Sequence, residues 1–172
     1  GEPAAQPVPI DAFVANIAGA TNEIEEKFFD PEVRIDGDIA TVWTRYDFLV
    51  DKQSDHCGYD SFHLARMEDG WKITQVSDTQ RRGAGCALDA IDLPPPTAAD
   101  SAAIVTALQA VFDGMAARDS AQLANAFHPA VTFSPVLEGE PRFGDAGFFI
   151  NMVKAAPYPI HERMDGPELR IH

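Results

Sequence analysis

Three stretches of alternating apolar and polar residues constrain this chain more than any other feature. The clearest is 38–48, where β-branched and aromatic residues recur at every second position. A period of two is typical of a strand whose two faces meet different surroundings. The pattern recurs at 58–67 and 71–78, and the turn residues Glu68-Asp-Gly70 separate these two stretches. We predict an antiparallel meander, entered from a short strand at 32–36 through a turn at Gly37.

The charge of the chain excludes several classes of function. The 172 residues include 13 Lys+Arg and 27 Asp+Glu, which gives a formal net charge of -14. A face that binds nucleic acid must be basic to displace the counterions of the phosphates, and anionic membranes repel an acidic protein for the same reason. No apolar run approaches the ~20 residues that span a bilayer. We expect neither nucleic acid nor a membrane as a partner.

Three consecutive prolines divide the chain. We interpret 94–100 as a linker between a sheet-bearing part, 10–93, and a helix-bearing part, 101–172. The strongest helical pattern in the chain covers 101–118, with Asp100 or Ser101 as its cap. We expect these further short elements: helices at 11–20, 121–127 and 148–155, and strands at 131–133 and 136–138.

The two ends of the chain resemble each other at a constant offset of 136 residues, from Pro31 to Pro167. Pro-Glu-Val-Arg-Ile at 31–35 matches Pro-Glu-Leu-Arg-Ile at 167–171, and the same offset aligns 13–14 with 149–150. Self-similarity at a fixed offset indicates a duplicated unit. We interpret the chain as starting inside one copy of the unit and ending inside a second copy. Residues 101–172 and the strands of 32–80 would then together supply all the helices and strands of one unit, in permuted order.

Short motifs in a consistent order resemble the nuclear transport factor 2-like superfamily, which includes SnoaL-like polyketide cyclases, ketosteroid isomerase and scytalone dehydratase. A helix at 101–118 precedes a short helix, His128-Pro129 and a strand. The sheet half resembles a bacterial subgroup through these motifs: Ile39-Ala-Thr-Val-Trp43, Tyr46-Asp-Phe48, His56-Cys-Gly58, Asp60-Ser-Phe62, Gly70-Trp-Lys-Ile73 and Asp78-Thr-Gln-Arg81.

The resemblance implies an α+β fold in which three helices wrap a cone-shaped, strongly curved mixed or antiparallel sheet. It implies that the cone binds a small apolar or aromatic organic ligand, without a cofactor. The alternative that it implies is an isomerase, cyclase or dehydratase that uses a buried Asp or His as an acid–base group. Because the element order is permuted here, the halves close within one chain, exchange in a homodimer, or belong to a longer tandem protein.

The resemblance also directs attention to residues that could carry the chemistry. An acid–base group of this kind needs a pKa raised by burial and a donor placed where negative charge develops. The candidates for catalysis are Asp60, Asp78 and His128. The candidates for ligand binding are Trp43, Tyr46, Phe62, His63 and Phe133.

Each candidate has a structural alternative. Asp60 could instead form an ion pair with Arg81 or Arg45, and His128 could bond the backbone at a helix end. His63 lies three positions after Asp60, so on a regular strand the two side chains point to opposite faces and cannot form a dyad. The five histidines show no metal-ligand spacing, and we expect no metal site.

Cys57 and Cys86 are the two cysteines of the chain. A structural pair would require an oxidising compartment, and we expect two unpaired buried thiols instead. The Pro- and Ala-rich residues 2–9 have the composition of a segment left after removal of a signal peptide. A periplasmic or secreted location and a cytoplasmic one therefore both stay open.

Overall fold

The computed structural model describes residues 7–86, 97–137 and 140–164 of the 172-residue chain. Of the described residues, 7–86 belong to a compact sheet unit, and 97–137 and 141–164 belong to a compact helix unit. The expected linker at 94–100 is too long, because a helix begins within it at Ala98. Residues 94–96 lie outside the described residues.

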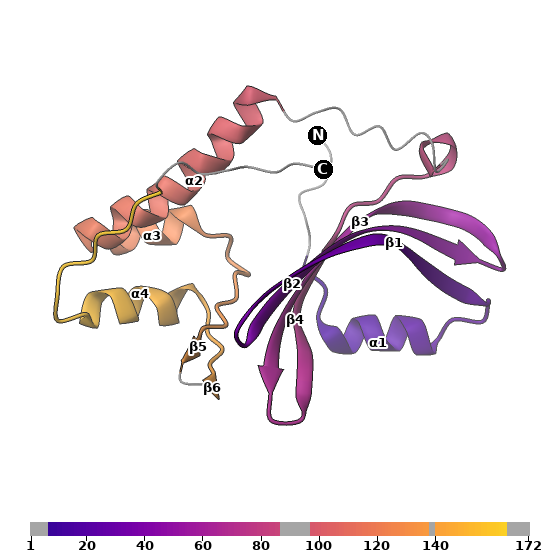
Figure 1. Cartoon of the computed structure of the whole chain (residues 1–172), viewed down its shortest axis with the longest axis horizontal. Helices are drawn as coiled ribbons and strands as arrows, with labels where there is room; N and C mark the ends of the chain where they lie inside the picture. The colour runs from indigo at the N-terminus through magenta and orange to yellow at the C-terminus, as the bar shows by residue number, and fades with distance from the viewer. Residues whose placement is uncertain (1–6, 87–96, 138–139, 165–172) are drawn as a thin grey trace. The chain divides into compact units, whose positions relative to one another are not determined.

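The sheet unit contains a four-stranded antiparallel sheet in the order β1-β2-β3-β4. Its strands are β1 (Ile24–Asp36), β2 (Ile39–Val50), β3 (Gln53–Met67) and β4 (Gly70–Asp78). Figure 1 shows the four strands side by side as a twisted sheet. The antiparallel meander is therefore confirmed. Gly37, at φ 55°, occupies the left-handed region in the turn between β1 and β2, where a side chain would be strained.

Strand β1 is longer than the expected strand at 32–36. It begins at Ile24 and pairs with β2 along its whole length, with a register shift between Phe29 and Glu32. Asp30 has a φ of 50° at this bulge, and Pro31 follows it. Proline cannot donate a ladder hydrogen bond and is tolerated at bulges. The strand continues past the proline instead of starting there, so the expected boundary is wrong.

The two faces of the sheet carry different side chains. We call one of them the Asp60 face. By the strand register it includes Glu26, Phe28, Thr44, Tyr46, Phe48, His56, Gly58, Asp60, Phe62, Val76 and Asp78. The opposite face carries Trp43 stacked on Tyr59, with ring centroids 5.4 Å apart. The Asp60 face thus combines aromatic and aliphatic side chains with five polar ones, Glu26, Thr44, His56, Asp60 and Asp78.

Two short elements accompany the sheet. Helix α1 (Ile10–Ala18) precedes it and has no buried residue. The apolar side chains of α1 that the sequence pattern identified, Phe13, Val14 and Ile17, are 43% to 55% exposed. The 3₁₀ turn η1 (Gly83–Cys86) follows β4 and contacts β3.

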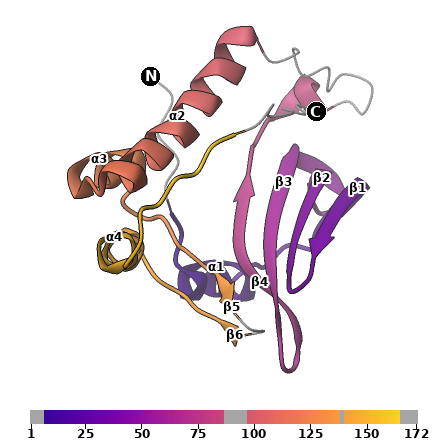
Figure 2. The ribbon, with the colours of Figure 1, turned by 60° about the vertical axis from the view of Figure 1, so that its left-hand side comes forward.

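The helix unit is built from α2 (Ala98–Ala117), α3 (Ser120–Ala126) and α4 (Ala146–Ala155), with a small ladder of β5 (Val136–Leu137) and β6 (Glu140–Pro141). Figure 2 shows α3 next to the end of α2, and α4 near α3. Met115, Leu123 and Val153, one from each helix, form its buried core. Each helix therefore contributes its apolar stripe to one small core.

Local hydrogen bonds set the helix limits. Thr97, and not Asp100 or Ser101, caps α2: its hydroxyl accepts from the Asp100 backbone N–H, and the Asp100 carboxylate accepts from the Thr97 backbone N–H. Such a reciprocal capping box satisfies two donors that the helix leaves free. The expected strand at 131–133 is absent among the described residues, where Phe133 forms only an isolated bridge with Gly144.

Candidate functional site

Asp60 lies in the middle of β3, between Thr44 of β2 and Asp78 of β4. Only 4% of the residue is exposed. Its Oδ2 atom has no hydrogen-bond partner within the described part of the chain. None of the ion pairs formed there includes Asp60, so the alternative of a pair with Arg81 or Arg45 is not found. No described residue pairs with the buried carboxyl of Asp60.

The surroundings of Asp60 favour its protonated form. Burial raises the pKa of Asp60 to about 7, and the nearby carboxylates of Glu26 and Asp78 contribute to the rise. A carboxyl that titrates near neutral pH can act as an acid or as a base. A catalytic role for Asp60 stays a prediction.

Glu26 and Asp78 join Asp60 in an acidic cluster on the Asp60 face, with one carboxyl each from β1, β3 and β4. Partial burial raises the pKa of Glu26, the charge of His56 opposes the rise, and Asp78 adds to it. Asp78 is exposed and accepts a hydrogen bond of 3.0 Å from the Gln80 side chain. Sequence reasoning missed Glu26, because only the pairing of β1 with β2 brings it onto this face.

Tyr46 of β2 adds a buried hydroxyl group to this face. It is 2% exposed, and its hydroxyl donates to the carbonyl oxygen of Thr79 at 3.0 Å. Burial raises the pKa of Tyr46, the charges of Asp78, Asp60 and Glu26 add to the rise, and Arg81 opposes it. The hydroxyl thus stays protonated, and its hydrogen atom is donated to the carbonyl oxygen of Thr79.

Gly58 allows this arrangement. A Cβ atom on Gly58 would lie 1.7 Å from the carbonyl oxygen of Thr79, which is far inside van der Waals contact. Thr79 is held in place by its backbone N–H, which donates to Tyr59 at 3.0 Å, and by its hydroxyl, which accepts from the Tyr59 backbone at 3.1 Å. Only glycine at position 58 leaves room for the chain that follows β4.

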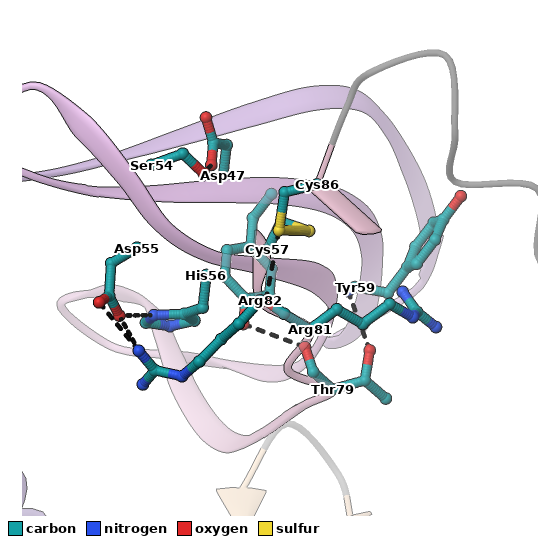
Figure 3. The surroundings of a disulfide bond; sticks show 11 residues. Asp47, Ser54, Asp55, His56, Cys57, Tyr59, Thr79, Arg81, Arg82 and Cys86 are labelled. Atoms are coloured by element: carbon teal, nitrogen blue, oxygen red, sulfur yellow. Dashed lines mark hydrogen bonds and ion pairs between the residues drawn. A yellow bond between two sulfur atoms is a disulfide. The ribbon is translucent and has the colours of Figure 1, made fainter. Parts of the chain in front are cut away.

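A carboxylate–imidazole pair lies at the edge of the Asp60 face (Figure 3). The Asp55 carboxylate lies 2.8 Å from Nδ1 of His56 and accepts two bonds of 2.9 Å from one guanidinium nitrogen of Arg82. The bond to His56, together with Arg82, lowers the pKa of Asp55. The imidazole stacks on Phe48 at 4.7 Å. Such a pair fixes the orientation of the ring and is a common arrangement of a general base.

Sequence reasoning did not identify this pair. Adjacent residues of a regular strand point to opposite faces, which argues against contact between Asp55 and His56. In the structure the register shifts where His56 pairs with Phe48 and Ser54 pairs with Leu49. The extra residue at this bulge is Asp55, and the local change of direction lets its carboxylate reach the imidazole.

Cys57 and Cys86 form a disulfide, with their Cα atoms 5.6 Å apart (Figure 3). The expectation of two unpaired thiols is therefore wrong. Cys57 and Arg81 also exchange two backbone hydrogen bonds, of 3.0 and 2.8 Å. The disulfide and these bonds hold the segment after β4 against β3, next to the Thr79 carbonyl that Tyr46 contacts.

The predicted ligand-binding residues of the sheet do not share one face. Tyr46 and Phe62 lie on the Asp60 face, where Phe62 meets Phe28 edge to face at 5.8 Å. Trp43 and His63 lie on the opposite face, and His63 is exposed. A ligand on one face cannot touch both pairs. The register also confirms that Asp60 and His63 point to opposite sides.

The remaining two candidates belong to the helix unit. Phe133 stacks on Phe149 with ring centroids 4.6 Å apart and meets Phe127 edge to face. His128 accepts a hydrogen bond of 3.1 Å from the backbone of Ala130 through Nδ1, which confirms its structural alternative. Both side chains thus have a role inside the helix unit itself.

Within residues 7–86, 97–137 and 140–164, no three His, Cys, Asp or Glu side chains gather in a way that could hold a metal ion. No helix in these ranges is both long enough and apolar enough to cross a bilayer. No protein-family model, curated protein or solved structure matches this chain.

Proposed function

We propose that the sheet unit binds a small organic molecule on the Asp60 face. The observation that carries this proposal is the buried Oδ2 atom of Asp60, which has no hydrogen-bond partner among the described residues. An unsatisfied buried acceptor costs about 1–3 kcal/mol, so a fold that retains one gains by offering it to a ligand. A hydroxyl or N–H of the ligand would supply the missing bond.

The surroundings of Asp60 suit such a ligand. Binding sites for small molecules combine mostly apolar walls with a few converging polar groups. The rings of Phe28 and Phe62 and the side chain of Val76 provide apolar surface, and Phe28 and Val76 are 50% and 52% exposed. Asp60 is the buried polar group among them. The ligand would therefore lay an apolar or aromatic body on these side chains.

The cone of the nuclear transport factor 2-like fold remains our proposal for the complete site. The duplication supports it: α1 begins at Ile10 and α4 at Ala146, which differ by the same 136 positions as the repeated sequence. In α4, Phe149, Ile150 and Val153 pack in the helix-unit core. We propose that the helix unit covers the sheet, within one chain or by exchange in a homodimer.

Acid–base catalysis is the second candidate, of the isomerase, cyclase or dehydratase kind. The pKa of Asp60, raised to about 7 without an arginine partner, favours it. His56, oriented by Asp55, lies on the same face. Uptake of deuterium from D₂O into a β,γ-unsaturated ketone, lost in Asp60→Asn, would support catalysis. If such ketones bind but take up no deuterium, the result supports binding without catalysis.

The disulfide supports a periplasmic or secreted location, since structural disulfides persist in oxidising compartments. Labelling of free thiols in intact source cells, before lysis, tests this proposal. Cys57 and Cys86 should resist alkylation until a reductant is added. Rapid alkylation of both in untreated cells would place the protein in a reducing compartment.

Ligand titration followed by NMR tests the proposed binding. We expect 1-naphthalenemethanol, a neutral aromatic alcohol, to shift the resonances of Tyr46, Asp60 and Phe62. Asp60→Leu should weaken binding about tenfold, because it removes the polar anchor. Asp36→Leu, at an exposed carboxyl near the end of β1, is the matched control and should leave binding unchanged. Shifts confined to Trp43 and Tyr59 would place the ligand on the opposite face and contradict the proposal.

A further inference from the structure

We propose that the ligand of the Asp60 face is an organic cation, a protonated amine with an apolar body; this inference rests on the proposed binding at that face. The acidic cluster of Glu26, Asp60 and Asp78 draws its carboxyls from three strands of one face. The charge of Glu26 and that of Asp78 both reach Asp60 and disfavour its ionised form. A cation bound next to Asp60 would offset this repulsion.

Asp60 differs from the other acidic groups of the sheet unit in being buried without an ion pair. No ion pair within the described residues includes Glu26, Asp60 or Asp78. Several other acidic residues of the described unit, such as Asp36 and Asp47, also lack such a pair, but six have a lysine or arginine within 4.0 Å. These are Glu23 with Lys52, Glu25 with Lys27, Glu32 with Arg34, Asp38 with Arg66, Asp55 with Arg82, and Asp69 with Lys72. Of the acidic residues that the structure describes, only Asp60 is both buried and without an ion pair, so its charge needs a cation supplied by a ligand.

The burial of Asp60 is a second observation, independent of the charge of the cluster, that indicates a ligand at this face. Its carboxyl is nine-tenths or more buried, and Oδ2 has no partner in the described structure. An ionised carboxyl in such a place needs both a hydrogen-bond donor and an opposite charge. An ammonium group supplies both in one atom, whereas a neutral hydroxyl supplies only the donor.

Aromatic rings around the cluster favour an organic cation over a bare metal ion. Tyr46 lies between the carboxyls of β1 and β3, and Phe28 and Phe62 meet edge to face beside it. Ring faces attract ammonium groups, and the attraction increases when water is excluded. The described residues offer no group of ligands suited to a metal ion. An amine with an aromatic or aliphatic body matches both the charge and the apolar surface.

The inference predicts how affinity depends on pH. The titratable and charged groups around Asp60 are Glu26 on β1, Tyr46 on β2, His56 on β3 and Asp78 on β4, together with Arg81, whose charge acts on Tyr46. An amine holds Asp60 in its ionised form, so binding releases a proton where Asp60 is protonated beforehand. Because the pKa of Asp60 is about 7, affinity for the amine should rise between pH 6 and pH 8. Affinity for a neutral alcohol should not rise.

Three matched probes on the full chain test the charge of the ligand. At pH 8 we expect 1-naphthylmethylamine to bind at least tenfold more tightly than 1-naphthalenemethanol, and 1-naphthoate to bind most weakly. Asp78→Asn should lower the affinity for the amine about fivefold and leave that for the alcohol within twofold. Asp78 is exposed, so this variant keeps the fold even where Asp60→Asn disturbs it. Asp36→Asn is the control and should change neither affinity.

The outcomes separate the two proposals. If the alcohol binds the Asp60 face as tightly as the amine, the cation inference is wrong and the proposed binding stands. If the amine binds more tightly but Asp78→Asn and Asp60→Asn leave its affinity unchanged, the charge is recognised elsewhere and the inference also fails. If none of the three probes shifts resonances on the Asp60 face, both proposals fail.

Discussion

The hydroxyl of Tyr46 donates a hydrogen bond of 3.0 Å to the carbonyl oxygen of Thr79. Tyr46 belongs to β2 and Thr79 follows β4, so the bond passes over β3, which lies between these strands. The hydrogen bond crosses β3 at Gly58, which pairs with Tyr46. The carbonyl group of Thr79 occupies the space that a side chain at position 58 would need. One side chain thus connects three strands next to the buried carboxyl of Asp60.

Tyr46→Phe should destabilise the sheet unit by about 1 kcal/mol, the usual net contribution of one hydrogen bond. The Thr79 residue is exposed, so its carbonyl can bond water in the variant, which keeps the loss small. Urea unfolding followed by tryptophan fluorescence measures the change. Tyr158→Phe removes a hydroxyl from a residue that is 66% exposed and should have no effect. Equal losses in both variants would contradict the structural role of the Tyr46 hydroxyl.

Gly58→Ala should destabilise the sheet unit by roughly 3 kcal/mol, near the upper end of overpacking penalties. The new methyl group would meet the backbone of Thr79, which cannot rotate away as a flexible side chain could. The same unfolding experiment measures it. Ser61→Ala on the same strand is the control, with a change of at most about 0.5 kcal/mol. A Gly58→Ala protein as stable as the parent would show that Thr79 does not lie over this position.

Loss of the disulfide should lower the free energy of unfolding by roughly 3–4 kcal/mol, the chain-entropy value for a loop of this size. Cys57 and Cys86 are separated by 29 positions. Denaturant unfolding with and without dithiothreitol measures the effect. The Cys57→Ala/Cys86→Ala double variant should match the reduced parent and should not respond to the reductant. If thiol titration of the unreduced, denatured protein finds two free thiols, the pairing is contradicted.

Leu123→Ala should destabilise the helix unit by about 2–5 kcal/mol, because Leu123 is fully buried between Met115 and Val153. Both tryptophans, Trp43 and Trp71, lie in the sheet unit, so their fluorescence follows the sheet. If the helix unit covers the sheet as proposed, the fluorescence transition should shift with the helical circular dichroism.

The exposed neighbour Asn125 provides the control for this experiment. Asn125→Ala should leave both transitions in place. A Leu123→Ala protein whose helical transition shifts while the tryptophan transition does not would mean that the two units unfold independently. That result would count against a cone shared between them.

Local pattern was enough to predict most of the sheet. In strands β2 to β4 the residue types alternate along the chain, because successive side chains point to opposite faces of the sheet. Such a pattern predicts a strand without any information on which strands pair with it. The first half of β1 does not alternate in this way. Its charged residues and Pro31 are held in a strand by pairing with β2, from Ile24 opposite Val50 onward. Such non-local pairing overrides the local propensity.

The site was only partly predictable. Asp60 became a candidate through the family resemblance, which implies a buried acid–base group. Its coupling to Glu26 depends on the register of three strands, which the sequence does not specify. The contact of Asp55 with His56 depends on a bulge, and the pairing of Cys57 with Cys86 depends on the turn η1. Spacing along the chain alone left the two cysteines open to either state.

The stability of the chain should depend on pH through Asp60. Its pKa is about 7 in the folded protein, against 3.8 as the ordinary value, so the folded state binds more protons between these limits. Stability should therefore fall as pH rises from about 4 to 7, by roughly 4 kcal/mol for this group alone. In Asp60→Asn this contribution should disappear, and the contribution of Glu26, whose pKa is also raised, should remain. Asp36→Asn should keep the pH dependence of the parent.

The most direct test is the titration of the Asp60 side-chain carboxyl carbon by ¹³C NMR, with Asp60→Asn to assign the resonance. A buried carboxyl without a cationic partner should titrate with a midpoint near pH 7. The midpoint should fall when 1-naphthylmethylamine is added. A midpoint near 4 in the free protein would mean that Asp60 is solvated or paired, and would contradict the site proposed for this face.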